Sequence, residues 1–452
     1  MAGRPSELMY VETPLLEQLK QLGWTVVQLD DSEKHDPQKS FRESFSEVVI
    51  VSRLKAALKR LNPWLNDVQV DDLCVQVQNY PHPLRQILEN NEEVYDRITE
   101  GLSADNEESG EINCPVRLID WRDVDAYDGP NATDNDFLAI SQYKVRIPGK
   151  EEYIIPDIVL FVNGLPLVVI ECKAPDITEP MAEGIDQLMR YQNRRGAEEL
   201  EGVPELFYFN QIIMSTCFHD CRYSSITGGV SHFMEWKDAY PYKLRDINPN
   251  GKPSAQEIAV AGMLEPSHLL DIVQNFIAYK DEDSGIRVKL VPRYMQYRGA
   301  NKIIERLRNA AKGEKGGTLW HTQGTGKTLT MMFVIRKMYN SFDLNNYKVV
   351  LIVDRKDLQT QMFKTTKTVK YAINIAGSID GLKDLIKNTA SDVTVAMVHK
   401  FGEAEKSKDK KGKKTGSLEQ RTSVSTFPVL NTSDRILVMI DEAHRSEYSE
   451  LA

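Results

Sequence analysis

The chain has 452 residues, of which 41% are hydrophobic and 27% charged, and a formal net charge of −10 at neutral pH. This length exceeds one hydrophobic core, so two or three domains are expected. The acidic balance excludes a protein that coats DNA by bulk attraction, but it permits local basic grooves. The sequence has no apolar run of membrane-spanning length, no basic-then-apolar signal peptide and no disulfide framework among its five cysteines. These features predict a cytoplasmic protein.

The first half of the chain predicts helices followed by short strands. Helical periodicity predicts helices over 10–25, Glu43–Leu61 and Pro83–Thr99, and the polar stretch Leu102–Asn113 predicts a loop. Asn163-Gly164 between two apolar runs is a strong hairpin signal. The later elements expected are strands over Phe137–Ile147, Asp157–Val162, Leu165–Lys173 and Phe207–Thr216, a helix over Glu179–Arg195, and an insertion and linker over 220–255.

A domain boundary is expected near Glu265-Pro266, and helices alternate with strands beyond it. The expected strands are Gly317–Trp320, Lys348–Val353, Val393–Val398 and Arg435–Ile440. Most are continuous apolar runs, as in parallel strands that are buried on both faces, so a doubly wound α/β sheet is predicted. The lysine-rich segment 405–416 is interpreted as a solvated loop, with a DNA-contacting loop as the alternative.

One group of residues predicts metal-dependent phosphodiester chemistry. Pro156-Asp157 precedes Glu171-Cys172-Lys173, and alternation along a strand places Glu171 and Lys173 on one face. Two carboxylates and the carbonyl of Cys172 supply oxygen ligands suited to Mg²⁺, which would acidify a water and bind the scissile phosphate. Lys173 would orient that water and screen developing charge. The alternative is that Asp157 ends a turn and that Glu171 and Lys173 form a surface pair.

On the helix that follows, Gln187 and Tyr191 share one face. Together with Asp157, Glu171 and Lys173 they resemble the PD-(D/E)xK nuclease fold, in its RecB-like branch. Glu12 sits where that branch often carries an additional acidic residue. The segment Cys217–Cys221 could be considered as a metal site, but it has no second ligand pair, so a structural role is expected.

A second group, His321-Thr-Gln-Gly-Thr-Gly-Lys-Thr328, predicts a phosphate-binding loop that leads into a helix. Backbone N–H groups of such a loop hold phosphate oxygens. Lys327 would reach the β- and γ-phosphates of ATP and Thr328 would bind Mg²⁺. The remaining loop positions are Gln323, Gly324, Thr325 and Gly326. His321 replaces the glycine of the general motif, a departure that superfamily 2 helicases and translocases, which this segment resembles, tolerate.

Further residues fit the same resemblance. Asp441, at the end of an apolar strand, would hold Mg²⁺, and Glu442 would position the attacking water. His444 would couple the ATP site to nucleic acid or to the next motor lobe. The remaining matches are Arg293 and Gln296, which resemble an adenine-reading segment, and Arg355 and Lys356, which resemble contacts to the DNA backbone.

The order of these motifs resembles the restriction (R) subunit of type I restriction–modification enzymes. The resemblance implies a RecB-like nuclease domain over 1–265 and a first RecA-like motor lobe over 266–452. It also implies ATP-driven translocation and Mg²⁺-dependent double-strand cleavage of unmethylated DNA, in a bacterium or archaeon. The partners would be double-stranded DNA and the methyltransferase and specificity subunits. The family continues with a second motor lobe and a helical region, so an N-terminal fragment is expected.

Two alternatives to this function remain open from the sequence. One is a RecB-like repair nuclease fused to a helicase. The other is a nucleotide-gated DNA-binding module without catalysis, against which the intact Asp157, Glu171 and Lys173 argue.

Overall fold

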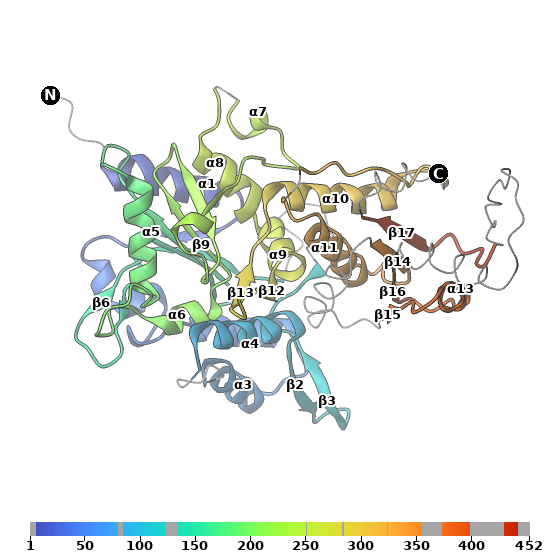
Figure 1. Cartoon of the computed structure of the whole chain (residues 1–452). Coiled ribbons are helices and arrows are strands. Elements are labelled where there is room, and N and C mark those ends of the chain that lie inside the picture. Colours follow the sequence, from blue (N-terminus) through green and yellow to red (C-terminus); the bar gives the residue numbers. More distant parts are fainter. Residues whose placement is uncertain are drawn as a thin grey trace, which may run out of the picture. The chain divides into compact units, whose positions relative to one another are not determined.

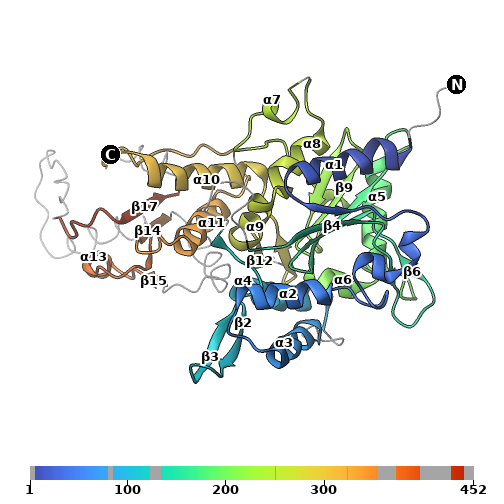
Figure 2. The ribbon, with the colours of Figure 1, turned by 180° about the vertical axis from the view of Figure 1, so that it is seen from behind.

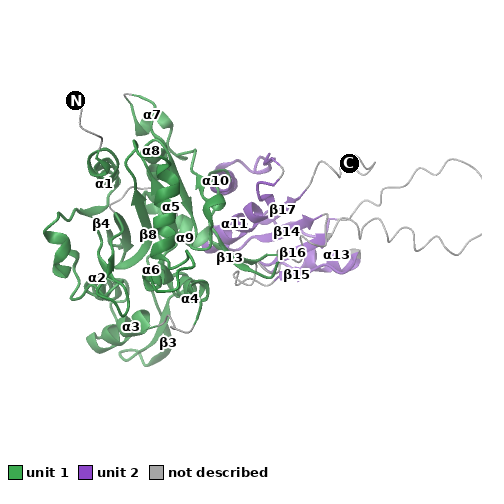
Figure 3. Ribbon diagram, turned by 60° about the vertical axis from the view of Figure 1, so that its left-hand side comes forward, with its two compact units in different colours: residues 1–295 green, residues 296–452 purple. Residues whose placement is uncertain are grey.

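The chain forms two compact units, residues 1–295 and 296–452 (Figures 1, 2 and 3). The computed structural model describes residues 6–79, 85–122, 134–249, 251–282, 284–322, 324–353, 373–397 and 429–441. The division falls after Met295 and not at Glu265-Pro266. The reason is that helix α9 (Pro266–Asn275) packs on the π-helical turn η6 (Val260–Leu264), which in turn contacts the first helix of the chain.

A seven-stranded mixed sheet, in the order β1-β4-β7-β8-β9-β10-β11, forms the centre of unit 1. Within it β8 runs parallel to β9 and antiparallel to β7. The central strands β4, β7, β8 and β9 are buried at every residue, which accounts for their continuous apolar sequences. The strands are β1 (Thr25–Val27), β4 (Phe137–Ser141), β7 (Ile158–Val162), β8 (Leu165–Cys172), β9 (Ile212–Thr216), β10 (Cys221–Ser224) and β11 (Met234–Glu235).

Among its described residues, unit 1 also contains helices and three small hairpins. The helices are α1 (Thr13–Gln21), α2 (Val51–Leu61), α3 (Asp67–Asn79), α4 (Ile87–Glu100), α5 (Pro180–Tyr191), α6 (Pro204–Phe209), α7 (Leu244–Ile247), α8 (Ala255–Ala259) and α9, with short turns η1 (Leu8–Glu12), η2 (Glu33–His35), η3 (Pro37–Ser40), η5 (Val230–His232) and η6. The hairpins are β2 (Leu102–Asn106) with β3 (Glu111–Val116), β5 (Val145–Arg146) with β6 (Tyr153–Ile154), and β12 (Ala278–Asp281) with β13 (Arg287–Leu290).

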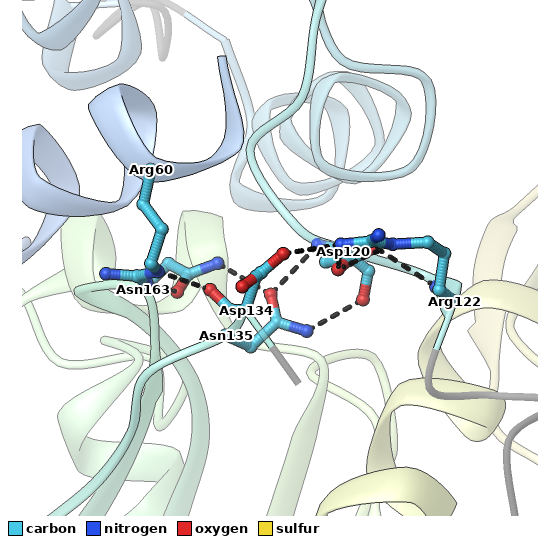
Figure 4. A network of polar contacts seen from close by, with 6 residues as sticks. All are labelled: Arg60, Asp120, Arg122, Asp134, Asn135 and Asn163. Carbon is cyan, nitrogen blue, oxygen red and sulfur yellow. Dashed lines mark hydrogen bonds and ion pairs between the residues drawn. The ribbon is translucent and has the colours of Figure 1, made fainter. Parts of the chain in front are cut away.

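The predicted β7–β8 hairpin is confirmed, and its turn is fixed by a polar network (Figure 4). Asn163 and Gly164 have φ angles of 52° and 81°, as a type I′ turn requires. The Asn163 side chain donates to Asn135 Oδ1 at 2.8 Å and accepts from Arg60 at 3.2 Å. The side chain of Asn135 in turn donates to the Asp120 carbonyl at 2.7 Å. With the turn held, the register places Asp157 beside the end of β8.

Several predicted elements of unit 1 differ from the structure. The second helix begins only at Val51, after turns. The stretch Leu102–Asn113 was expected to be a loop, and this is wrong: it belongs to the β2–β3 hairpin, in which most residues are polar because only its base, at Leu102 and Val116, is buried. The strand expected over Phe137–Ile147 breaks after Ser141, because Gln142 takes a positive φ of 53°.

The region after α5 also departs from the expectation. The strand predicted from Phe207 begins only at Ile212, because Pro204 starts the short helix α6. Part of 220–255, expected to be an insertion and linker, instead adds β10 and β11 to the central sheet. Helix α3 was not predicted, because its apolar positions alternate with polar ones over part of its length.

Unit 2 contains a four-stranded parallel sheet in the order β15-β16-β14-β17, which confirms the prediction of parallel strands. The predicted strand Gly317–Trp320 is wrong, since these residues form no strand and Trp320 is 87% exposed. Only two apolar residues follow Gly316-Gly317 in this segment, which is too few to form a buried strand. The elements within its described residues are β14 (Lys348–Val353), β15 (Ile373–Ile375), β16 (Val393–Met397), β17 (Ile436–Ile440), α11 (Lys327–Asn340), α13 (Ile379–Lys387) and α10 (Tyr294–Asn309), which begins two residues before the unit.

Candidate nuclease and nucleotide sites

The fold brings Asp157, Glu171 and Lys173 together at one end of the β7–β8 hairpin. Asp157 immediately precedes β7, and its Oδ2 accepts a hydrogen bond from the backbone N of Cys172 at 2.7 Å. Lys173 Nζ donates to Glu171 Oε1 at 2.7 Å and to the Cys172 carbonyl at 2.9 Å. Glu171 is 0% exposed and Lys173 5%. The alternative of a solvent-exposed surface pair is therefore wrong.

The group of Asp157, Glu171 and Lys173 has two carboxyl groups and only one cationic side chain. Burial raises the pKa of Glu171 well above its usual value, and the nearby Asp157 carboxylate raises it further. Burial also raises the pKa of Asp157, although Lys173 partly offsets the effect. Burial lowers the pKa of Lys173, but the Glu171 and Asp157 carboxylates outweigh it, so the pKa is raised overall. One lysine therefore faces two buried carboxyl groups, whose ionised forms need a further cation.

Two more carboxyl groups extend this acidic cluster. Glu12, at the end of the π-helical turn η1, is 2% exposed, and its Oε2 accepts from Gln142 Nε2 at 3.2 Å. Burial and then Asp157 raise the pKa of Glu12 to about 8. Burial and then Asp157 also raise the pKa of Glu7. Glu12 thus lies within the electrostatic reach of the site, and π-helical turns recur at functional sites.

The donor set fits a hard divalent cation. Oε2 of Glu171 and Oε1 of Glu12 are buried and accept no hydrogen bond within the described part of the chain. Among those same residues no three His, Cys, Asp or Glu side chains lie close enough to hold an ion by themselves. Mg²⁺ does not need such a cage, because it is commonly bound by one or two carboxylates and keeps several waters. Asp157, Glu171 and the Cys172 carbonyl are the residues that would hold it.

Gln187 and Tyr191 share one face of α5, and they contact each other. Gln187 Nε2 donates to Tyr191 Oη at 2.5 Å, and Tyr191 Oη donates to the Ile155 carbonyl at 3.0 Å. Their hydrogen bonds therefore run to the segment just before Asp157 and not to either carboxylate. The pKa of Tyr191 is raised by burial and then by Glu171, so the hydroxyl remains a proton donor.

Helix α5 approaches the site closely because Gly184 has no side chain. A Cβ at Gly184 would lie 2.1 Å from Ser215 Oγ and 3.3 Å from Lys173 Cγ. Ser215 pairs with Glu171 across β8 and β9 and is fully buried. The sequence pattern identified neither Ser215 nor Gln142, because nothing local distinguishes them from other polar residues at strand ends.

We expect Gly184→Ala to destabilise unit 1 by about 1–2 kcal/mol. The 2.1 Å approach to Ser215 Oγ is a severe overpacking, which costs about 2–3 kcal/mol, and alanine gains only about 1 kcal/mol over glycine inside a helix. Urea unfolding measures the change. Gly316→Ala, at a glycine with open space around its Cβ position, is the control, and Ser215→Ala should restore part of the loss in the double variant. A Gly184→Ala protein that is as stable as wild type would contradict this packing.

Stability should also depend on pH through Glu12. The folded state holds the Glu12 proton up to about pH 8, whereas the ordinary value is 4.5, so its stabilising contribution is present at low pH and lost as the pH rises between these values. In chelator, Glu12→Gln should therefore raise the melting temperature at about pH 9, by about 2–4 °C for each 1 kcal/mol by which ionised Glu12 destabilises the fold, and change little at about pH 5. Glu17→Gln, at an exposed site on α1, is the control. An equal effect of Glu12→Gln at both pH values would contradict the assignment.

In unit 2 the loop before α11 contains two glycines in the left-handed region of backbone space. Gly324 and Gly326 both have a φ of 79°, and α11 begins at Lys327. Thr325 Oγ1 donates to the Thr322 carbonyl at 2.6 Å. Gln296 Nε2 donates to the carbonyls of Thr325 and Gly326 at 3.1 and 3.2 Å, and a Cβ at position 326 would lie 2.6 Å from that nitrogen. The Gln296 amide thus braces the loop from α10.

The structure describes some, but not all, of the other residues that were predicted to bind nucleotide. Lys327 and Thr328 are half-buried on the first turn of α11, which lies beside the sheet (Figures 1 and 2). Asp441 follows β17, is buried, and donates its backbone N–H to the Ile352 carbonyl at 2.9 Å. Arg293 is exposed and belongs to unit 1. The positions outside the described residues are Gln323, Arg355, Lys356, the segment 405–416, Glu442 and His444.

The cysteines of the Cys217–Cys221 segment are buried and unpaired with each other. Burial raises the pKa of both thiols, that of Cys221 to about 12. Cys217 begins a tight turn between β9 and β10, and Cys221 follows it as the first residue of β10; the Cys217 backbone N donates to the Asp220 carbonyl at 3.0 Å. Protonated thiols in this setting pack as small apolar groups.

Two family models match the chain. Residues 4–229 match the type I restriction enzyme R protein N terminus, and residues 295–452 match the SWI2/SNF2 ATPase. The chain belongs to the type I restriction enzyme R protein family. The two matched segments contain the acidic cluster and the glycine-rich loop, respectively. None of the described helices is both long and apolar enough to cross a membrane.

Three curated endonuclease subunits of type I restriction enzymes are similar to this chain. The HindI endonuclease subunit of Haemophilus influenzae is 28% identical over 97% of this chain, and the putative MjaIXP endonuclease subunit of Methanocaldococcus jannaschii is 26% identical over 100%. The putative MjaVIIP endonuclease subunit of the same archaeon is 30% identical over 60% of the chain. The chain spans 39% and 41% of the length of the first two relatives.

Proposed function

We propose that this chain is the nuclease and first motor region of a type I restriction subunit. The protein would use ATP to translocate DNA and would cut both strands of unmethylated DNA with Mg²⁺. The observation that carries the proposal is the buried group of Asp157, Glu171 and Lys173. These residues lie in the segment that matches the restriction R protein family, and a later segment of the same chain matches the SWI2/SNF2 ATPase.

In this proposal unit 1 is a PD-(D/E)xK nuclease of the RecB-like branch. A Mg²⁺ held by Asp157, Glu171 and the Cys172 carbonyl would acidify a water and bind the scissile phosphate. Lys173 holds Glu171 in place and presents an ammonium group to the charge that develops on the phosphate. Gln187 and Tyr191 brace α5 against the segment that leads to Asp157.

Unit 2 would be a first RecA-like lobe of superfamily 2. The loop from Gln323 to Gly326 would hold the phosphates of ATP through backbone N–H groups, with Lys327 on the β- and γ-phosphates. Thr328 and Asp441 would hold Mg²⁺, and Glu442 would position the attacking water. Arg293 and Gln296 would read the adenine. The buried amide of Gln296, which already binds the loop, would link adenine recognition to the phosphate cradle.

The partners would be double-stranded DNA and the methyltransferase and specificity subunits, in the cytoplasm of a bacterium or archaeon. The experiment is to combine the full-length protein with these subunits and a long unmethylated duplex. Double-strand cleavage should require both ATP and Mg²⁺ and should disappear when the duplex is methylated. Cleavage that is independent of ATP, or a preference for DNA ends, would favour a repair nuclease instead.

A further inference from the structure

Gln142 joins two of the carboxyl groups at the acidic cluster. Its Nε2 donates to Glu12 Oε2 at 3.2 Å and to Asp157 Oδ1 at 3.3 Å. Glu12 lies at the end of η1 and Asp157 immediately before β7, so one amide nitrogen joins two segments that are far apart in sequence. An amide with two donor hydrogens and no charge can satisfy both oxygens at once.

The backbone at Gln142 is bent in a way that serves this contact. Its φ of 53° lies in the left-handed region, which a residue with a Cβ enters only at a cost in strain. The conformation ends β4, and the Gln142 backbone N–H donates to the Asp157 carbonyl at 2.8 Å. The same residue therefore holds Asp157 by its main chain and by its side chain. Strained residues that are fixed in this way cluster at functional sites.

We propose that Gln142 is a positioning residue that sets the placement of the Glu12 and Asp157 carboxyl groups for cation binding. The inference rests on the proposed nuclease function. Without the amide, Glu12 Oε2 and Asp157 Oδ1 would both lose the donor that joins them, and both carboxyl groups would move. Partners that orient metal-binding side chains commonly change metal affinity by about 10- to 100-fold when they are replaced.

Calorimetric titration of the nucleotide-free 452-residue chain with Mn²⁺ tests the proposal without catalysis. Wild type should bind the ion and Asp157→Ala should not. Gln142→Met, which keeps length but removes both donors, and Gln142→Gly, which also relieves the left-handed backbone, should each weaken binding at least about tenfold. Asn113→Gly, at an exposed residue with a φ of 55°, is the matched control and should bind as wild type does.

Melting temperatures separate positioning from a general structural role. Gln142→Gly should melt above Gln142→Met, because glycine adopts the left-handed region without strain, yet both variants should lose affinity equally. Wild-type affinity in either variant, or an affinity that follows the melting temperature, would overturn the role of Gln142 alone. Absence of Asp157-dependent Mn²⁺ binding in wild type would instead remove the proposed nuclease site, and the inference with it.

Discussion

Glu171→Ala is expected to lower DNA cleavage by the assembled enzyme by at least about 10²–10³-fold, the range for losing one electrostatic stabiliser from a preorganised site. ATP hydrolysis should continue, because the acidic cluster belongs to unit 1 and the glycine-rich loop to unit 2. Asp157→Ala and Lys173→Ala should behave in the same way. Gel analysis of a long unmethylated duplex and a phosphate-release assay measure the two activities.

The control for these variants is Glu152→Ala, which removes an exposed carboxylate from the same unit. It should cut DNA at the wild-type rate. Wild-type cleavage by any of the three alanine variants would exclude that residue from the site, and loss of ATP hydrolysis would show that the variant disturbs more than unit 1.

Lys327→Ala is expected to lower both ATP hydrolysis and ATP-dependent cleavage by at least about 10²-fold, because it removes the main positive side chain near the transferred phosphoryl group. Glu442→Gln should instead retain ATP while hydrolysis stops. Binding of a fluorescent ATP analogue, measured beside hydrolysis, distinguishes the two variants.

Lys387→Ala is the matched control for the motor, since Lys387 is exposed on α13 and its ion pair with Asp384, at 3.5 Å, contributes little. It should leave both activities unchanged. Normal ATP-dependent cleavage in Lys327→Ala would contradict the assignment of the loop to ATP.

The parts of the fold that local sequence determines were predicted best. Asn163-Gly164 carries its own turn geometry, so the β7–β8 hairpin and the nearness of Asp157 to Glu171 followed from the sequence. The buried parallel strands of unit 2 were equally clear, because strands with both faces covered are continuous apolar runs. In Gly317–Trp320 the apolar run was too short to distinguish a strand from an irregular segment.

The missed features depend on contacts between distant segments. Gln142 has no local signal, since its partners Glu12 and Asp157 come from other elements. The spacing of Gln187 and Tyr191 correctly placed them on one face of α5, but only the structure shows that their hydrogen bonds run to Ile155. The division after Met295 likewise depends on how α9 packs within unit 1, which periodicity along α9 does not reveal.

The most direct test of two separate sites on one chain measures double-strand DNA cleavage and ATP hydrolysis in the same reaction. The assembled enzyme is given a long unmethylated duplex with ATP and Mg²⁺, as wild type, as Glu171→Ala and as Lys327→Ala. We predict both activities in wild type, ATP turnover without cleavage in Glu171→Ala, and neither activity in Lys327→Ala. Double-strand cleavage by Glu171→Ala at the wild-type rate would contradict the account, because the cutting centre would then lie elsewhere.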